Sequence, residues 1–353
     1  MAEFLPASGR QASDATQWPP PVEGEHLLNN FQFTSGDRMP LRIHFRTLGN
    51  LRRDQRGVAR NAVLVLHGTG ASGADFMRPE FAGELFGPGQ PLDAGEYFIV
   101  LPDGIGHGRS ARPSDGMRAR FPRFGYRDMI AAQYLLLSEG LQLNHLRLVM
   151  GTSMGGMHTW LWGEQHPEFM DALLPLACLP SQICARNRVW RRIICDAIRN
   201  DPDWRGGEYQ RQPPSLRTAA QVLFLMASNP LLRWQQMPTL GDSDAVLDAA
   251  VAAAVEQSDA NDVLYQIEAS GDYDPAPHLE QIRAPLLAVN WADDLINPPE
   301  LEILQREIRR VPHGSAFVMP FTLHTRGHES QMLAAGWKHH LLQLLASAPH
   351  RST

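Results

Sequence analysis

The chain has 353 residues, with 32 basic and 38 acidic side chains that give a formal net charge of −6. Lys338 is the one lysine among them, so any reaction that needs a catalytic lysine must use Lys338 or be absent. No G-K-[ST] motif and no block of basic residues occur, which excludes a phosphate-binding P-loop and argues against a nucleic-acid partner. Hydrophobic residues make up 43% of the chain, enough to build a large core.

Residues 1–25 are polar and rich in proline, and we predict that they form a flexible N-terminal arm. This segment lacks the charged and apolar regions of a signal peptide, so a cytoplasmic protein is the default expectation, with export after signal removal left open. No apolar run is long enough to cross a membrane. The three cysteines match neither a disulfide framework nor a zinc-binding spacing.

After two short extended segments at 31–36 and 41–49, apolar runs alternate with helical patterns. Runs that are apolar on both faces are typical of strands in a buried parallel sheet. Helical periodicity appears between them, and this alternation predicts an α/β fold with a mostly parallel sheet flanked by helices. The predicted strands are 61–67, 97–104, 145–151, 172–178, 285–292 and 315–321, and the predicted helices are 126–141, 154–166, 301–311 and 334–347.

Residues 181–280 break this alternation. They contain helix-like segments at 186–200, 216–227 and 243–257 but no clear strand. We therefore predict a helical lid over 181–280, inserted into an α/β core that comprises residues 26–180 and 281–353.

The motif G-T-S-M-G at 151–155 lies between a predicted strand and a predicted helix. A serine on such a tight turn has a strained backbone that exposes its hydroxyl, and glycines on either side avoid a clash in the turn. The following helix directs its N–H groups toward the serine. We predict that Ser153 is a nucleophile; the alternative is an ordinary glycine-rich connection.

An activated serine needs a histidine base and an acid, which in this architecture follow it in the order acid, then histidine. The acid should come after a late strand, where Asp293 and Asp294 stand together, and we prefer Asp294 because of its distance from the turn at Pro298. The histidine should lie in the loop after the last strand, and we prefer His328 to His324 as the general base.

Two backbone N–H groups are expected to form an oxyanion hole, one from Met154 and one from Thr69 in the H-G-T-G loop. Gly68, Gly70 and Gly73 also spell the dinucleotide fingerprint G-x-G-x-x-G. Because Pro79 interrupts the helix that a dinucleotide site requires, we predict no cofactor. No helical H-E-x-x-H pair occurs, so no metal is predicted either.

These motifs resemble the α/β-hydrolase superfamily and, more narrowly, its homoserine O-acetyltransferase branch. The resemblance covers about residues 60–345 and rests on G-T-S-M-G-G-M and on the segments 121–133 and 201–209. It implies Ser153, Asp294 and His328 as a catalytic triad beneath a helical lid. Two stretches depart from the branch: D-G-I-G-H-G-R-S at 103–110 looks like an ester hydrolase, and S-L-R-T-A-A-Q in the lid lacks an expected arginine.

We therefore expect a serine hydrolase that cleaves a small-molecule carboxylic ester through an acyl-enzyme. The alternative is an O-acyltransferase that moves an acyl group from acyl-coenzyme A to homoserine or another alcohol. The oligomeric state stays open, with a homodimer as one option. The lid arginines at 186, 188, 191 and 192 could clamp a carboxylate or a coenzyme A phosphate, but we favour the interpretation that they are solvated. We expect Lys338 on the solvent face of the last helix.

Overall fold

A computed structural model describes residues 18–349 of the chain. Its centre is an eight-stranded sheet in the order β1-β2-β4-β3-β5-β6-β7-β8. From β4 onward in this order every neighbouring pair is parallel, and the β1–β2 hairpin joins β4 in antiparallel orientation. The strands are β1 Val22–Gln32, β2 Arg38–Leu48, β3 Ala62–Leu66, β4 Phe98–Pro102, β5 Leu148–Thr152, β6 Leu173–Leu176, β7 Leu286–Trp291 and β8 Gly314–Met319.

The central strands are buried on both faces because helices cover both sides of the sheet. Every residue of β3, β5 and β6 is buried, which accounts for their unbroken apolar sequences. One core cluster contains residues of α1 (Tyr126–Leu135), α2 (Met154–Gln165) and α8 (Ile303–Glu307), and the other contains residues of α9 (Lys338–Ser347). The mostly parallel α/β fold predicted from the sequence is confirmed.

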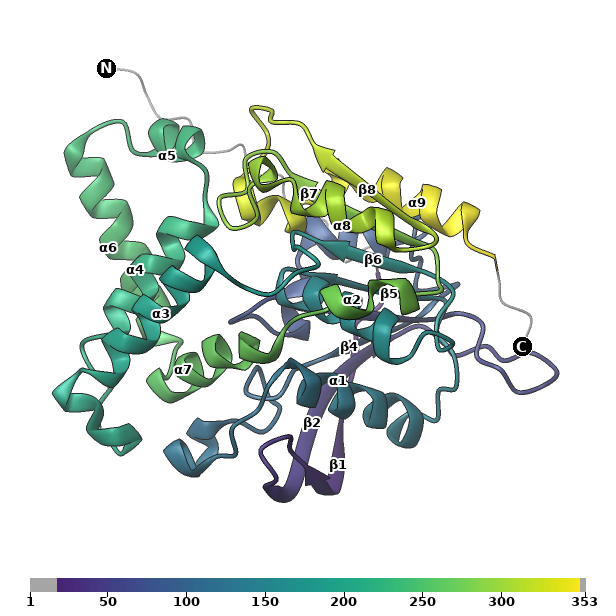
Figure 1. Cartoon of the computed structure of the whole chain (residues 1–353), viewed down its shortest axis with the longest axis horizontal. Coiled ribbons are helices and arrows are strands. Elements are labelled where there is room, and N and C mark those ends of the chain that lie inside the picture. Colours follow the sequence, from purple (N-terminus) through teal and green to yellow (C-terminus); the bar gives the residue numbers. More distant parts are fainter. Residues whose placement is uncertain (1–17, 350–353) are drawn as a thin grey trace.

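Five α-helices occupy the interval between β6 and β7. They stand together at one end of the molecule, beside the sheet (Figure 1). Trp190, Leu216 and Leu264 belong to a third hydrophobic cluster that these helices form among themselves. The predicted lid falls on this group, although the sequence pattern missed α5 and α7. The helices are α3 Ala185–Arg199, α4 Leu216–Ala227, α5 Pro230–Gln236, α6 Leu240–Glu256 and α7 Ala260–Glu268.

Two expectations for the ends of the chain need correction. Most of the predicted arm lies in residues 1–17, outside the described residues, but β1 begins at Val22, so residues 22–25 belong to the sheet. Lys338 is not free on the solvent face: its Nζ lies 2.7 Å from Glu84 Oε2 and 2.9 Å from Gln90 Oε1, and its side chain is 28% exposed. Lys338 therefore anchors the start of α9 to the segment after β3.

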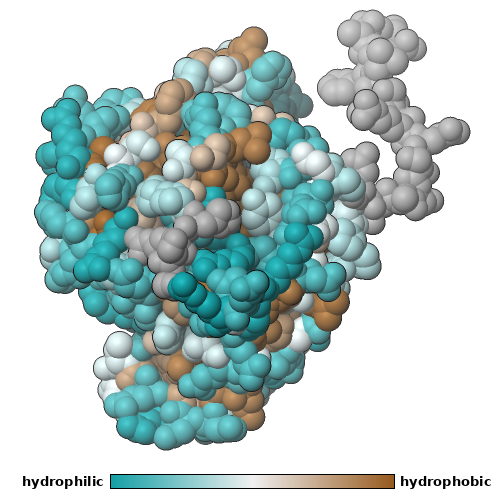
Figure 2. All heavy atoms as spheres, turned by 90° about the vertical axis from the view of Figure 1, so that its right-hand side faces the viewer, coloured by the Kyte–Doolittle hydropathy of each residue, from teal (hydrophilic) through white to brown (hydrophobic). Residues whose placement is uncertain are grey.

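None of the helices within residues 18–349 is both long and apolar enough to cross a bilayer. Figure 2 shows the side of the molecule turned away from α3–α7, where hydrophilic side chains predominate and hydrophobic ones are interspersed.

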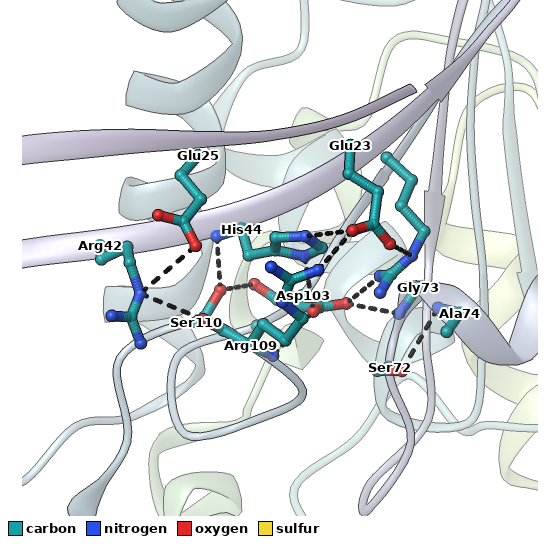
Figure 3. A network of polar contacts seen from close by, with 12 residues as sticks. Glu23, Glu25, Arg42, His44, Ser72, Gly73, Ala74, Asp103, Arg109 and Ser110 are labelled. Carbon is teal, nitrogen blue, oxygen red and sulfur yellow. Dashed lines mark hydrogen bonds and ion pairs between the residues drawn. The ribbon is translucent and has the colours of Figure 1, made fainter. Parts of the chain in front are cut away.

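A buried carboxylate ties the hairpin to the loops at the end of the sheet (Figure 3). Asp103, directly after β4, accepts hydrogen bonds from Arg46 Nη1 (3.0 Å), Gly73 N (2.8 Å) and Arg109 N (2.9 Å), and lies 2.9 Å from His44 Nδ1. Burial alone would raise the pKa of Asp103, but these donors and nearby positive charge outweigh it and hold the pKa below its ordinary value. Asp103 therefore fixes the loop that begins at His67.

Replacing Asp103 should destabilise the whole fold. Asp103→Ala leaves the N–H groups of Gly73 and Arg109 without their acceptor and Arg46 with only the half-exposed Glu23, so we expect a loss of about 3–5 kcal/mol in the free energy of unfolding. Urea unfolding followed by tryptophan fluorescence measures this. The control is Glu25→Ala, which removes an exposed ion pair with Arg42 and should change the midpoint little. Equal midpoints for both variants would contradict a central role for Asp103.

Candidate active site

Ser153 occupies the turn between β5 and α2. Its φ of 53° and ψ of −111° lie in a region that non-glycine residues rarely adopt. Its backbone N–H donates to Leu176 O at 2.9 Å, which holds the turn against β6. The turn leaves the Ser153 side chain half-exposed at the carboxyl edge of the parallel strands.

Two glycines make this turn sterically feasible. A Cβ on Gly151 would lie 2.2 Å from Gly155 O, and a Cβ on Gly155 would lie 1.9 Å from Leu66 O. Both separations are far below any contact between real atoms, so neither position accepts another residue without a backbone shift. The glycines therefore let α2 cross β3 closely enough for its first turn to lie behind Ser153.

The structure brings Ser153, His328 and Asp294 together in one hydrogen-bonded chain. His328 Nε2 lies 2.8 Å from Ser153 Oγ, and His328 Nδ1 lies 2.8 Å from Asp294 Oδ2. Asp294 Oδ1 accepts from the backbone N–H of Ile296 at 2.8 Å, and Asn297 Nδ2 donates to Oδ2 at 3.0 Å. The carboxylate is thus oriented from both sides.

The electrostatics keep Asp294 ionised. Burial alone would raise its pKa, but the attraction of His328 and the donors of Asn297 and Ile296 hold the pKa below the ordinary value. A buried carboxylate that accepts the N–H of one imidazole nitrogen stabilises the imidazolium that forms when the other nitrogen takes up a proton. In His328 that other nitrogen, Nε2, faces Ser153 Oγ. This arrangement can activate a hydroxyl for attack on a carbonyl.

The two less favoured candidates, Asp293 and His324, occupy different places. Asp293 Oδ2 accepts from Gly327 N at 2.9 Å and from Asn229 Nδ2 at 2.7 Å, so it holds the backbone next to His328 without reaching the imidazole. His324 is exposed, and its backbone N–H donates to Thr322 Oγ1. Asp293 is a positioning group for the histidine loop, which the sequence alone did not reveal.

The two predicted oxyanion donors flank Ser153. Met154 is the first residue of α2, where a helix leaves N–H groups without an intrahelical acceptor. The loop after β3 passes close to the serine: a Cβ on Gly68 would lie 3.4 Å from Ser153 Cβ. Thr69 is the next residue in this loop. The same loop leads into a five-residue 3-10 helix at Gly73–Met77. A dinucleotide site with the G-x-G-x-x-G motif requires a longer α-helix at this place.

A cavity of about 740 Å³ lies over Ser153. Its walls come both from the core and from the α3–α7 helices, so a bound molecule would contact these helices as well as the serine. Among residues 18–349 there is no cluster of three or more His, Cys, Asp or Glu side chains suited to a metal ion. Lining residues from both sides include Thr69, Ser153, His328, Arg191, Met226 and Ile267.

Arg191 corrects the interpretation of the lid arginines as solvated. It is 2% exposed and lines the cavity. Its neighbours along α3, Trp190, Ile194, Cys195 and Ile198, are buried too, and these positions follow helical spacing. Arg191 thus lies in the apolar stripe of α3, and this periodicity was the signal in the sequence that could have identified it. In contrast, the exposed Arg192 pairs with Asp196 at 2.6 Å.

Comparison with known proteins agrees with this architecture. A family model described as alpha/beta hydrolase fold matches residues 61–333. The chain belongs to the α/β-hydrolase family. Within it, the sequence relatives place the chain in the homoserine O-acetyltransferase-like branch. The homoserine O-acetyltransferase of Haloarcula marismortui is 30% identical over 72% of each chain. That of Thermobifida fusca is 35% identical over 51% of this chain, which spans half the length of that protein.

Solved α/β-hydrolase structures superpose on most of the chain. Homoserine O-acetyltransferase from Bacillus anthracis matches with a TM-score of 0.82 at 21% identity, covering 94% of this chain and 99% of that one. An acetylester hydrolase from Corynebacterium glutamicum matches with a TM-score of 0.80 at 19% identity, covering 92% and 96%. At these identities the likeness shows the fold alone.

The crossing of α2 over β3 can be tested at one glycine. Gly155→Ala pushes a Cβ into the backbone of Leu66, which cannot move without breaking the sheet, so we expect a loss of about 3 kcal/mol or more in unfolding free energy. Gly336→Ala is the control, because no atom lies within 4 Å of its added Cβ, and its effect should stay within about 0.5 kcal/mol. Urea denaturation compares the two. A Gly155→Ala protein as stable as the Gly336→Ala protein would contradict the close crossing.

Proposed function

We propose that the protein is an O-acyltransferase that carries an acyl group on Ser153 and passes it to an alcohol. The hydrogen-bonded chain from Asp294 through His328 to Ser153, at the floor of a lidded cavity, carries this proposal. The sequence relatives named homoserine O-acetyltransferase support transfer over the hydrolysis expected from the sequence.

In the proposed mechanism His328 Nε2 takes the proton of Ser153 Oγ as the oxygen attacks the donor carbonyl. The N–H groups of Met154 and Thr69 stabilise the negative charge that develops on the carbonyl oxygen. The leaving group takes the proton from His328 and departs, and an acyl-enzyme remains. An acceptor alcohol then gives its proton to His328 and attacks the acyl carbon. The bond from the acyl carbon to Ser153 Oγ breaks, His328 returns the proton to that oxygen, and the new ester leaves. Asp294 stabilises the imidazolium in both halves.

Ester hydrolysis is the second candidate, and it uses the same acyl-enzyme with water as the acceptor. Its support comes from the two departures from the branch, at 103–110 and at S-L-R-T-A-A-Q, which spans the N-cap and first turns of α4. The choice between the two reactions depends on whether an alcohol reaches the acyl-enzyme before water does. Donor and acceptor are small molecules in both cases, with acyl-coenzyme A as the donor that the transferase alternative expects.

The roles of the two adjacent aspartates can be separated by matched variants. Asp294→Asn removes the anion that stabilises the imidazolium, and turnover of p-nitrophenyl acetate should fall by about 10³- to 10⁴-fold. Asp293→Asn weakens a charge-assisted bond to Gly327 N and should cost only about tenfold, because Asp293 acts through the loop. Steady-state kinetics of both purified variants distinguishes them. A larger loss for Asp293→Asn would reverse the assignment.

The transferase proposal is tested by supplying acceptors. With acetyl-coenzyme A as donor, we expect coenzyme A release to rise several-fold when homoserine, serine or another hydroxy compound is added, with the O-acetyl product seen by mass spectrometry. If coenzyme A is released at the same rate with and without each acceptor, and acetate is the sole product, the protein is a hydrolase instead. The matched variant Ser153→Ala should lose about 10³-fold or more in either reaction, because the nucleophile is gone.

A further inference from the structure

Asn229 joins the α3–α7 helices to the two loops that carry the acid and the base of the site. It precedes α5 and is 2% exposed, and its Oδ1 accepts the N–H of Leu232 at 2.7 Å, which caps the helix. Its Nδ2 donates to Asp293 Oδ2 at 2.7 Å, in the loop after β7, and to Thr325 O at 3.0 Å, in the loop after β8. One buried amide therefore ties a helix of this group to both loops.

The backbone beside Asn229 also packs against the loop after β8. Gly327 immediately precedes His328 and has a φ of 58°. A Cβ on Gly327 would lie 3.1 Å from Ser228 C and 3.2 Å from Asn229 N. On the other side it would lie 3.2 Å from Asp293 O. Gly327 is therefore held tightly between the start of α5 and the loop after β7, where a side chain would force the backbone apart.

Asp293 depends on two donors, one from each side. The N–H of Gly327 donates to its Oδ2 at 2.9 Å, and the Asn229 amide donates to the same oxygen. Its buried Oδ1 has no partner within residues 18–349. Loss of the Asn229 amide would leave a poorly solvated carboxylate with a single donor, and such a group moves to find another.

A movement of Asp293 would be passed on to the general base. Gly327 follows Asp293 through their hydrogen bond, and His328 is the next residue in the chain. His328 must keep both of its 2.8 Å contacts, to Ser153 Oγ and to Asp294 Oδ2, for proton transfer. A displacement of about 1 Å in such an arrangement can lower a rate by about 100-fold.

The loop after β7 has further contacts with the same helices. Arg186, in the first turn of α3, donates from Nη2 to Leu295 O. Ile296 packs against the hydrophobic cluster that these helices form among themselves. Both residues follow Asp294 directly in the chain. The helices therefore reach the acid side of the site as well as the base side, and Asn229 is the buried polar contact that they share.

We propose that Asn229 is a positioning residue for the general base, and that the α3–α7 helices hold His328 in its reactive place through this side chain. Asn229 acts on the imidazole through Asp293 and Gly327. This rests on the proposed acyl transfer at Ser153, because it concerns the base of that reaction. It gives the helices a second task besides forming a wall of the cavity: the base is aligned only while they are seated on the core.

The experiment separates the two functions of the Asn229 side chain. Asparagine, serine and aspartate are about equally good helix caps, so Asn229→Ser and Asn229→Asp preserve the start of α5. Serine lacks the amide donor, and aspartate sets a second carboxylate against Asp293. We expect kcat/KM for p-nitrophenyl acetate to fall by about tenfold in Asn229→Ser and by about 100-fold in Asn229→Asp. If Asn229 only caps α5, all three proteins should be equally active.

A compensating substitution tests the contact itself. Asn229→Asp combined with Asp293→Asn exchanges the two side chains, so that an amide again donates to a carboxylate. The double variant should regain about tenfold in kcat/KM over Asn229→Asp and approach Asp293→Asn alone, because the two positions act through one bond. The matched control is Thr239→Ala, which removes the exposed N-cap of α6 in the same group of helices and should leave kcat/KM unchanged.

Hydrogen exchange reports the position of the loop without any reaction. The amide of Gly327 should be protected in the wild-type protein by its hydrogen bond to Asp293. Asn229→Asp should speed exchange in the peptide that contains Gly327 by about tenfold. Peptides from α7 should keep their protection, which shows that the helices of this variant remain folded.

Two outcomes overturn the proposal: equal kcat/KM in the wild type, Asn229→Ser and Asn229→Asp, or a double variant no more active than Asn229→Asp. If Asn229→Asp does not fold, the comparison of Asn229→Ser with the wild type decides. Labelling of wild-type Ser153 with a fluorophosphonate separates this proposal from the proposed function. A protein that is not labelled refutes acyl transfer at Ser153, whereas a labelled protein whose activity does not depend on residue 229 refutes only the role of Asn229.

Discussion

The close crossing of α2 over β3 is the constraint on which the rest of the site depends. Gly155 stands where any side chain would enter the backbone of Leu66, and this proximity forces the chain to turn sharply at Ser153, whose φ is 53°. The same crossing aims the first N–H groups of α2 at the space beside the serine and brings the loop after β3 alongside it. The strain at Ser153 is sustained because the central strands β3, β5 and β6, which are buried along their whole length, resist its relaxation.

The other half of the site is held by carboxylates with different tasks. Asp294 contacts the imidazole, while Asp293 holds Gly327, and both come from the loop after β7. On the opposite side Asp103 fixes the loop that carries Thr69, by accepting from Gly73 N and from Arg46 of the hairpin. The histidine loop and the loop after β3 are therefore each held by a carboxylate that accepts a backbone N–H group, Gly327 N for Asp293 and Gly73 N for Asp103.

The parts of this structure that the sequence predicted are those with local signals. Strands buried on both faces have unbroken apolar sequences, and the turn at Ser153 has glycines at fixed offsets. The short α5 begins with a proline, and α7 mixes polar and apolar residues, so neither gave a clear periodic signal. Contacts between residues that are distant in the sequence leave no local signal. Asp103 and Arg46 are 57 positions apart, and a single sequence does not show that two such residues meet. We expected Arg191 to be solvated because it is charged, but its position in the apolar stripe of α3 buries it.

The choice between transfer and hydrolysis depends on which hydroxyl is held in line with the carbonyl of the acyl-enzyme. A protein can hold water at the acceptor position through hydrogen bonds alone. An acceptor alcohol competes with that water by gaining binding energy from the walls of the cavity over Ser153 and using it for orientation at the acyl carbon. Those walls come from both the core and the α3–α7 helices, so the helices take part in the choice of acceptor.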